Sequence, residues 1–202
     1  MKKLNLILTI ALSISLLQAC SWNKDSKKEA DSANAVKDTS TKPFLETDST
    51  KATSAQIEVG KDDAKFAVDA MAGGITEVEL GKLAQQKASD SRVKDFGAMM
   101  VTDHNKGNQE LLALGQSLRI ALPVVLDQAG QELKDRLSKK SGSDFDKAYV
   151  KAMVDDHKED IKAFENYARD GKSVDLRTFV SKTLPVLNKH LTAIQQISDS
   201  MK

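Results

Sequence analysis

The chain has 202 residues with 30 basic and 29 acidic side chains, and its formal net charge of +1 gives no support to a nucleic-acid-binding protein. Its single cysteine, Cys20, excludes a disulfide scaffold within the chain and a cysteine-ligated Fe–S cluster. A serine hydrolase has no support either, because the sequence contains no Gly-x-Ser-x-Gly motif.

Residues 1–19 have the order of a secretory signal, with Lys2 and Lys3 followed by an apolar run. The run ends at Leu17-Gln18-Ala19-Cys20, which resembles the bacterial lipobox, where cleavage before the cysteine is coupled to attachment of diacylglyceryl to its thiol. A transmembrane anchor is the alternative, but about 14 residues are fewer than the roughly 20 that a spanning helix needs. We therefore predict a lipoprotein of the cell envelope, periplasmic or outer-membrane, held to a membrane by the lipid on Cys20.

Residues 20–60 contain the lipidated cysteine and a segment rich in Ser, Thr, Lys, Asp and Ala. Such a composition has too little apolar surface to fold, so this segment is predicted to be a flexible polar tether. Without the two lysines of the signal, 28 basic and 29 acidic residues remain. The charge pattern therefore indicates no nucleic acid and no particular protein partner.

Residues 61–202 have helical periodicity throughout and are predicted to form one all-α domain. The predicted long helices cover about residues 62–88, 91–118, 143–170 and 173–200, and a short amphipathic helix covers about 127–137. Ser143 is the predicted N-cap of the third long helix, and the fourth is expected to begin near Ser173. Gly73, Gly81 and Gly107 are predicted to face inward, where backbones approach closely or leave room.

Two tight helical hairpins joined by a long middle connection predict a four-helix bundle with one crossover. That connectivity is shared by ferritin-like folds. The alternative is a simple up-down bundle in which the short extra helix packs on the end.

Three histidines lie on three different predicted helices, and each falls on or near the apolar stripe of its helix. They are His104, His157 and His190. The first helix has no histidine, but Glu77 interrupts the centre of its stripe of small residues, whereas Glu79 projects to the opposite side. A lone buried carboxylate is costly unless it is paired or binds a metal.

All four inward residues lie about midway along their predicted helices, so they are expected to meet at one level of the bundle. Neutral imidazoles suit Zn, Cu, Fe or Ni, so we predict a transition-metal site of Glu77, His104, His157 and His190, holding Fe, Cu or Zn. The alternative is a buried polar layer in which these groups hydrogen-bond one another without a metal.

The second and third long helices repeat one another at an offset of 53 residues, through Met-Val-Thr-Asp-His ending at His104 and Met-Val-Asp-Asp-His ending at His157. With Glu77-Val78-Glu79-Leu80-Gly81-Lys82-Leu83-Ala84 and Leu184-Pro185-x-Leu187-x-x-His190, these blocks resemble the DUF4142 family over about residues 62–198. The resemblance implies a ferritin-like envelope protein with a possible metal layer. It implies no reaction.

The pattern departs from di-iron ferritins, whose sites use Glu-x-x-His on two helices. Too few inward carboxylates are expected for a site that bridges two irons, so a mononuclear site is the simpler prediction. Asp103 and Asp156 are expected to point roughly 100° away from their histidines, as caps or as partners of the ligands. Asp160, closer to the core face, is the better spare ligand.

Met100 and Met153 lie one turn before His104 and His157. A thioether beside imidazole favours copper, and both are therefore possible additional ligands. The ordinary interpretation is that they fill gaps in the core.

Two functions follow from these patterns. The first is an envelope lipoprotein whose bundle binds a transition metal, for metal buffering or in a stress response. The second is a non-enzymatic structural or interaction module whose buried His/Glu layer is metal-free.

Overall fold

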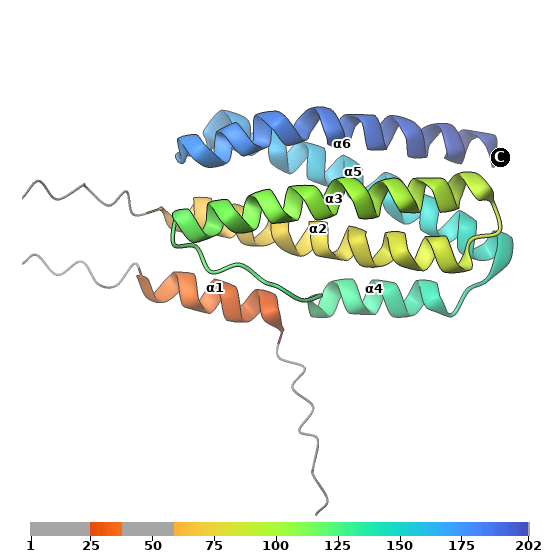
Figure 1. Ribbon diagram of the computed structural model, residues 1–202, viewed down its shortest axis with the longest axis horizontal. Coiled ribbons are helices and arrows are strands. Elements are labelled where there is room, and N and C mark those ends of the chain that lie inside the picture. The colour runs from red at the N-terminus through yellow and green to blue at the C-terminus, as the bar shows by residue number, and fades with distance from the viewer. Residues whose placement is uncertain (1–24, 38–58, 202) are drawn as a thin grey trace, which may run out of the picture.

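The computed structural model describes residues 25–37 and 59–201, and all regular secondary structure in these ranges is α-helical. The helices are α1 (Ser26–Lys37), α2 (Lys61–Lys87), α3 (Ser91–Ser117), α4 (Gln128–Ser138), α5 (Gly142–Asp170) and α6 (Val174–Ser200). The prediction of an all-α bundle is confirmed (Figure 1). The predicted signal segment and Cys20 lie outside the described residues, and so does most of the predicted tether.

Two of the long helices begin at side-chain caps. Asp90 accepts a hydrogen bond from the Arg92 amide at the start of α3, and Ser173 accepts one from the Leu176 amide at the start of α6. The prediction of Ser143 as the N-cap of α5 is wrong. The helix begins at Gly142, because the carbonyl of Ser141 already accepts the first helical bond, from the Phe145 amide at 3.3 Å.

Helices α2 and α3 form one antiparallel hairpin, and α5 and α6 form another (Figure 1). The start of α2 contacts the end of α5 through Asp63 and Tyr167, and the end of α2 contacts the start of α5 through Ser89 and Asp146. Helices α2 and α5 are therefore antiparallel, and α3 and α5 run in the same direction. The connection that contains α4 makes this possible, because it returns along α2 to the end of the bundle where α5 begins.

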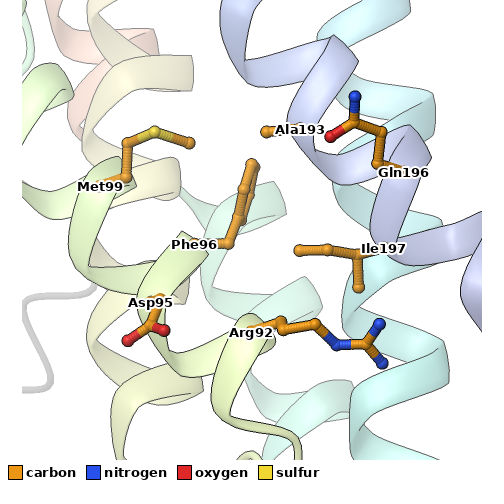
Figure 2. Close-up of a pocket in the computed structure, with 7 residues that line it drawn as sticks. All are labelled: Arg92, Asp95, Phe96, Met99, Ala193, Gln196 and Ile197. Atoms are coloured by element: carbon orange, nitrogen blue, oxygen red, sulfur yellow. The ribbon is translucent and has the colours of Figure 1, made fainter.

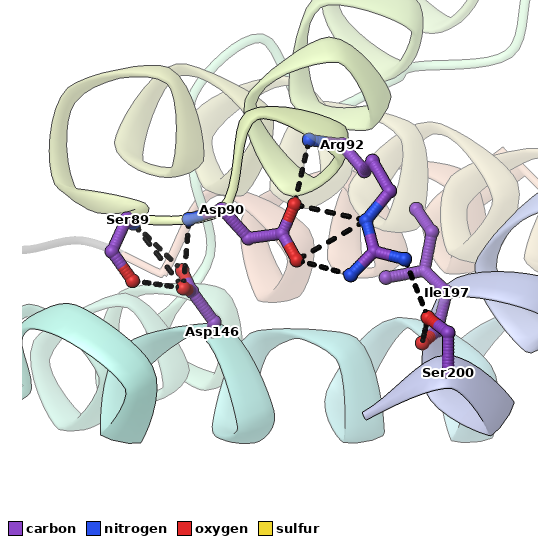
Figure 3. A network of polar contacts seen from close by, with 6 residues as sticks. All are labelled: Ser89, Asp90, Arg92, Asp146, Ile197 and Ser200. Carbon is purple, nitrogen blue, oxygen red and sulfur yellow. Dashed lines mark hydrogen bonds and ion pairs between the residues drawn. The ribbon is translucent and has the colours of Figure 1, made fainter. Parts of the chain in front are cut away.

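Each hairpin supplies a buried aspartate that caps the turn of the other. Asp146 of α5 accepts hydrogen bonds from the backbone amides of Ser89 (3.0 Å) and Asp90 (2.9 Å), and also from the Ser89 hydroxyl (Figure 3). At the opposite end, Asp63 of α2 accepts from the Lys172 amide at 3.0 Å and from the Tyr167 hydroxyl at 2.6 Å. Both carboxylates are only 3% exposed.

These two caps show that the hairpins are repeats of one another. Asp63 and Asp146 are 83 residues apart, and so are the capped residues Ser89 and Lys172. The same offset relates the apolar pairs Phe66 and Tyr149, Val93 and Leu176, Phe96 and Phe179, and Leu111 and Ile194. The repeat predicted at 53 residues relates α3 to α5 and does not superimpose one hairpin on the other.

The apolar core is divided into two clusters along the bundle axis. One cluster contains residues 80–100, 137–153 and 194–197, and the other contains residues 64–71, 111–120 and 161–187. On every long helix, the predicted site residue lies between the two clusters. These residues are Glu77, His104, His157 and His190.

The tight contact between α2 and α3 depends on two glycines. A Cβ atom on Gly81 would lie 2.7 Å from the carbonyl oxygen of Gly97, and a Cβ on Gly97 would lie 2.7 Å from the carbonyl oxygen of Gly81. Any side chain here would therefore push the helices apart. Gly107 is different, because a Cβ there would have no neighbour within 4 Å, so no close approach of backbones occurs at that position.

Within the predicted tether, residues 26–37 form helix α1, which corrects the expectation that this whole segment lacks structure. Its Asn34 side chain exchanges two hydrogen bonds of 2.9 Å with the backbone of Ala121, and Lys27 forms a 2.7 Å ion pair with Asp69 of α2. Polar contacts with a neighbouring loop thus hold a helix that has little apolar surface. None of the described helices is both long enough and apolar enough to cross a membrane.

We expect Asp146→Ala to lower the free energy of unfolding by roughly 2–4 kcal/mol, because it removes the acceptor of two backbone amides at a buried turn. Urea denaturation followed by circular dichroism measures this change. Asp144→Ala is the matched control, since Asp144 is an exposed residue in the same first turn of α5. A loss no larger than that of the control would contradict the role assigned to Asp146.

Candidate metal centre

The three histidines converge in the layer between the two apolar clusters. Their ring centroids are separated by 6.0 Å for His104 and His157, 5.2 Å for His104 and His190, and 5.5 Å for His157 and His190. His157 and His190 are fully buried, and the side chain of His104 is 11% exposed. Each ring can offer one nitrogen such that all three nitrogens lie within 4.8 Å of one another, an arrangement that could hold a metal ion.

Hydrogen bonds at one nitrogen of each ring fix the orientation of the imidazoles. Nδ1 of His157 lies 3.0 Å from the carbonyl oxygen of Met153, and Nε2 of His190 lies 2.9 Å from a carboxylate oxygen of Asp103. Nδ1 of His104 lies 2.8 Å from Oε2 of Glu77. When these nitrogens donate, the other nitrogen of each neutral ring carries a free lone pair.

Those other nitrogens have no hydrogen-bond partner among the described residues. The unpartnered buried atoms are Nε2 of His104, Nε2 of His157 and Nδ1 of His190, together with Oε1 of Glu77, Oδ2 of Asp156 and the hydroxyl oxygen of Tyr149. Buried polar atoms are nearly always hydrogen-bonded, so a group of such atoms in one layer needs a ligand, a proton or water to satisfy it.

Glu77 joins the histidines across the bundle. Its carboxylate is 1% exposed, and besides His104 it approaches His157, with 3.4 Å between Oε1 and Nε2. The structure therefore brings together all four residues that the sequence predicted to meet. Glu79 is separate from them, because its carboxylate forms ion pairs with Lys82 and Lys134.

Two further carboxyl groups from α5 adjoin the layer. Asp156 belongs to a second group that could hold a metal, because it, Glu77 and His157 each offer a ligand atom within 4.8 Å of the others. Asp156 points about 100° away from His157, as expected, and this direction brings its carboxyl group near Glu77 of the neighbouring helix. It therefore adjoins the layer as a neighbour of a predicted ligand. Asp103 likewise acts as a partner of a predicted ligand, His190.

Asp160 lies close to this second group but is not part of it. Its Oδ2 would lie 3.8 Å from a Cβ atom on Gly73, so its carboxyl group faces α2. The sequence does contain a signal for this arrangement. Asp156 and Asp160 are one helical turn apart, so their side chains are directed to the same neighbouring helix, which is α2.

Burial shifts every ionisable group of the layer toward its neutral form. Burial, reinforced by the charge of Asp160, holds the pKa of Glu77 well above its ordinary value. Burial and the neighbouring carboxylates raise the pKa of Asp156 to about 8 and that of Asp160 to about 7. Burial also lowers the pKa of His104, His157 (to about 3) and His190 (to about 4), so the imidazoles are neutral at pH 7.

Met100 and Met153 are fully buried and belong to one of the two apolar clusters, as expected of side chains that fill the core. Their role as metal ligands stays a prediction. Phe96 lies between the histidines and the surface, since its ring centroid is 6.2 Å from that of His157 and 6.5 Å from that of His190. Figure 2 shows Phe96 in the wall of a surface pocket of about 390 Å³ between α3 and α6.

A family model described as a domain of unknown function, DUF4142, matches residues 48–197. The chain belongs to the DUF4142 family. No curated protein and no solved structure matches it. Membership in this family supplies no activity, so the chemistry must be inferred from the residues of the layer itself.

These residues offer three neutral imidazoles and up to three carboxylates, with no thiol. Imidazole nitrogens suit Zn, Cu, Fe and Ni, whereas carboxylate oxygens suit harder cations such as Mn. No Lys or Arg within the described ranges forms an ion pair with Glu77, Asp156 or Asp160. The groups of this layer could therefore hold a metal ion.

In metal-free protein, we expect stability to fall as the pH rises, because of Asp156. Its pKa is 3.8 in a model peptide and about 8 in the folded chain, so the folded form keeps the proton to higher pH. The stability from this group is complete below about pH 4 and is lost as the pH rises through about 8. Relative to Asp156→Asn, the wild type should lose up to roughly 1.4 kcal/mol per pH unit in this interval.

Urea unfolding in the presence of a chelator, at several pH values between about 5 and 8, measures this difference. The matched control is Asp155→Asn, since Asp155 is an exposed neighbour that pairs with Lys151. Its pH profile should run parallel to that of the wild type. The same parallel behaviour for Asp156→Asn would contradict the shift assigned to Asp156.

Proposed function

We propose that this protein is an envelope lipoprotein whose helical bundle binds a transition-metal ion at His104, His157 and His190, with Oε1 of Glu77 as the fourth ligand. The observation that carries the proposal is the convergence of three buried imidazoles, each hydrogen-bonded at one nitrogen and unpartnered at the other. Protein metal sites commonly hold histidine ligands in this way, with a carboxylate or carbonyl fixing the tautomer.

The partners of the rings fit this interpretation one by one. Asp103 holds His190, the carbonyl of Met153 holds His157, and Oε2 of Glu77 holds His104. Glu77 then has two functions, because Oε2 orients an imidazole while Oε1 stays free for the ion. Three imidazoles and one carboxylate suit Zn, Cu or Fe. The set contains no thiol, so we propose metal storage or buffering as its role and not a thiol reaction.

We also assign the bundle to the ferritin-like four-helix arrangement. Two antiparallel hairpins, a crossover that contains α4, and a polar layer to which all four long helices contribute support this assignment. The envelope location rests on the signal segment and on the lipobox ending at Cys20. A bundle held near a membrane by a lipid would meet metal ions as they enter the envelope, which suits metal buffering under stress.

Metal should stabilise the purified protein, because an ion that binds only the folded state adds its binding free energy. At a concentration about 100-fold above the dissociation constant, the gain is about 2.7 kcal/mol, or roughly 5–10 °C in melting temperature. We expect this increment with Zn²⁺, Cu²⁺ or Fe²⁺ after removal of endogenous metal. Differential scanning calorimetry with metal analysis measures it.

His104→Gln and His157→Gln should lose the increment, whereas Glu79→Gln should keep it. Glu79 is the matched control, since it lies on α2 two residues from Glu77 but forms its ion pairs with lysines. If the wild type gained no stability from any of these metals, the layer would be a metal-free polar layer and the protein a structural or interaction module.

Cys20→Ala should abolish attachment to the membrane, because the thiol of Cys20 is the proposed site of diacylglyceryl transfer. We expect the wild type in the membrane fraction, labelled by radioactive palmitate, and the variant unlabelled. Both proteins should have the same helical circular dichroism spectrum, since Cys20 lies outside the bundle domain. A labelled, membrane-bound Cys20→Ala protein would overturn the lipoprotein proposal.

A further inference from the structure

The layer contains a second group of ligands that the three-histidine site does not use. Glu77 and Asp156 each offer a carboxylate oxygen within 4.8 Å of the other and of a ring nitrogen of His157. Oε1 of Glu77 and Oδ2 of Asp156 are both buried and without a hydrogen-bond partner in the described part of the chain. Glu77 is 1% exposed, so one unpartnered oxygen of an almost fully buried carboxylate, Oε1, faces this position.

One ion at the histidines engages only one of the three carboxyl groups of the layer. Glu77 contacts His104 and His157, whereas Asp156 and Asp160 contribute no ligand to the three-histidine group. Glu79, on the same helix as Glu77, is by comparison paired with Lys134 at 2.6 Å. Here no lysine or arginine fills that role, and a buried uncompensated charge is costly.

The repeat of the hairpins gives independent support. Glu77 of α2 and Asp160 of α5 are 83 residues apart, so they occupy equivalent positions in the two hairpins. Each hairpin therefore directs one carboxylate to the same region, on the side where α2 faces α5. Oδ2 of Asp160 lies against Gly73 of α2, a residue whose missing side chain leaves space beside that carboxylate.

We propose that the bundle binds a second divalent cation, of the hard type represented by Mn²⁺ or Fe²⁺, at Glu77 and Asp156 with Asp160 beside them. The proposal rests on the proposed function for the first ion. His157 has one free ring nitrogen, because Nδ1 is bound to the carbonyl of Met153, so it can serve one ion only. With His157 on the first ion, carboxylate oxygens of Asp156 and Asp160 hold the second, and Oε1 of Glu77 is shared between the two ions, because Oε2 accepts from His104.

The preference for a hard cation follows from the ligand atoms. Carboxylate oxygens favour Mn²⁺ and Mg²⁺, while the three imidazoles favour Zn²⁺ and Cu²⁺. The two positions should therefore bind different metals when both are supplied. A mixed pair with zinc at the histidines and manganese at the carboxylates is the expected state.

The test is a manganese titration of purified protein that has been stripped of metal and then loaded with zinc. Electron paramagnetic resonance of free Mn²⁺ measures manganese binding, and elemental analysis measures zinc. We expect one zinc and one manganese per chain. Asp156→Asn and, separately, Asp160→Asn should weaken manganese binding at least roughly tenfold and leave one zinc bound.

Asp155→Asn is the matched control and should leave both metals unchanged, because Asp155 is exposed and paired with Lys151. Thermal melts of each variant show whether it is folded, and using two separate carboxamide variants keeps the test valid if one of them fails to fold. Two zinc ions per wild-type chain, falling to one in either variant, would support the same assignment.

Three outcomes would overturn the second position. They are zinc binding without manganese binding, manganese binding unaffected by both variants, and loss of zinc together with manganese in both variants, which would indicate a single mixed site. Failure of the wild type to bind zinc at all is a different result. It would remove the proposed three-histidine site and, with it, the basis of this inference.

Discussion

The structure depends on one constraint, which is that three carboxyl and three imidazole groups share the interior of a helical bundle with no lysine or arginine paired to them in the described residues. Burial shifts the pKa of every one of these groups toward the neutral form, so a carboxyl group that ionises in the layer would need a cation to compensate its charge. The two apolar clusters on either side keep water out and hold the four helices at the level where these groups meet. The polar groups whose burial is costly are thus the same groups that could hold a metal ion.

Much of this site could be predicted from the sequence, because helical periodicity gives the direction of a side chain with an error of a fraction of a turn. Glu77, His104, His157 and His190 lie near the centres or edges of apolar stripes, and the structure places all four in one layer. The place of Asp156 in a second group of possible ligands could not be predicted in this way. Its direction differs by about 100° from that of its neighbour His157, but the neighbouring α2 lies on that side, and sequence periodicity does not indicate where a neighbouring helix lies.

Other errors arose where tertiary contacts decide the local structure. The apolar content of α1 is low, yet reciprocal hydrogen bonds between Asn34 and the backbone of Ala121 tie it to a loop 87 residues away.

The internal repeat visible in the sequence is that of the Met-Val-x-Asp-His motif, at an offset of 53 residues. The offset of 83 is carried by scattered apolar residues and by the two capping aspartates, and it becomes evident only when the capped turns are known. The histidines do not follow this repeat, since Leu187 occupies the position equivalent to His104. The symmetry of the scaffold is therefore broken at the site, where His157 and His190 give the second hairpin two imidazoles and the first has one.

The reciprocal caps have a consequence for the order in which a growing chain can fold. During synthesis from the N-terminus, the α2–α3 hairpin emerges first, but Asp146, the acceptor for the amides of its turn, lies 57 residues beyond Ser89. The donors to Asp63 are synthesised later still, because Tyr167 and Lys172 follow it by 104 and 109 residues. Neither hairpin is complete without the other, so the nascent first half has both an open turn and an exposed apolar face. For the export that we propose, this order of contacts would keep the chain from completing its bundle until nearly all of its residues had crossed the membrane.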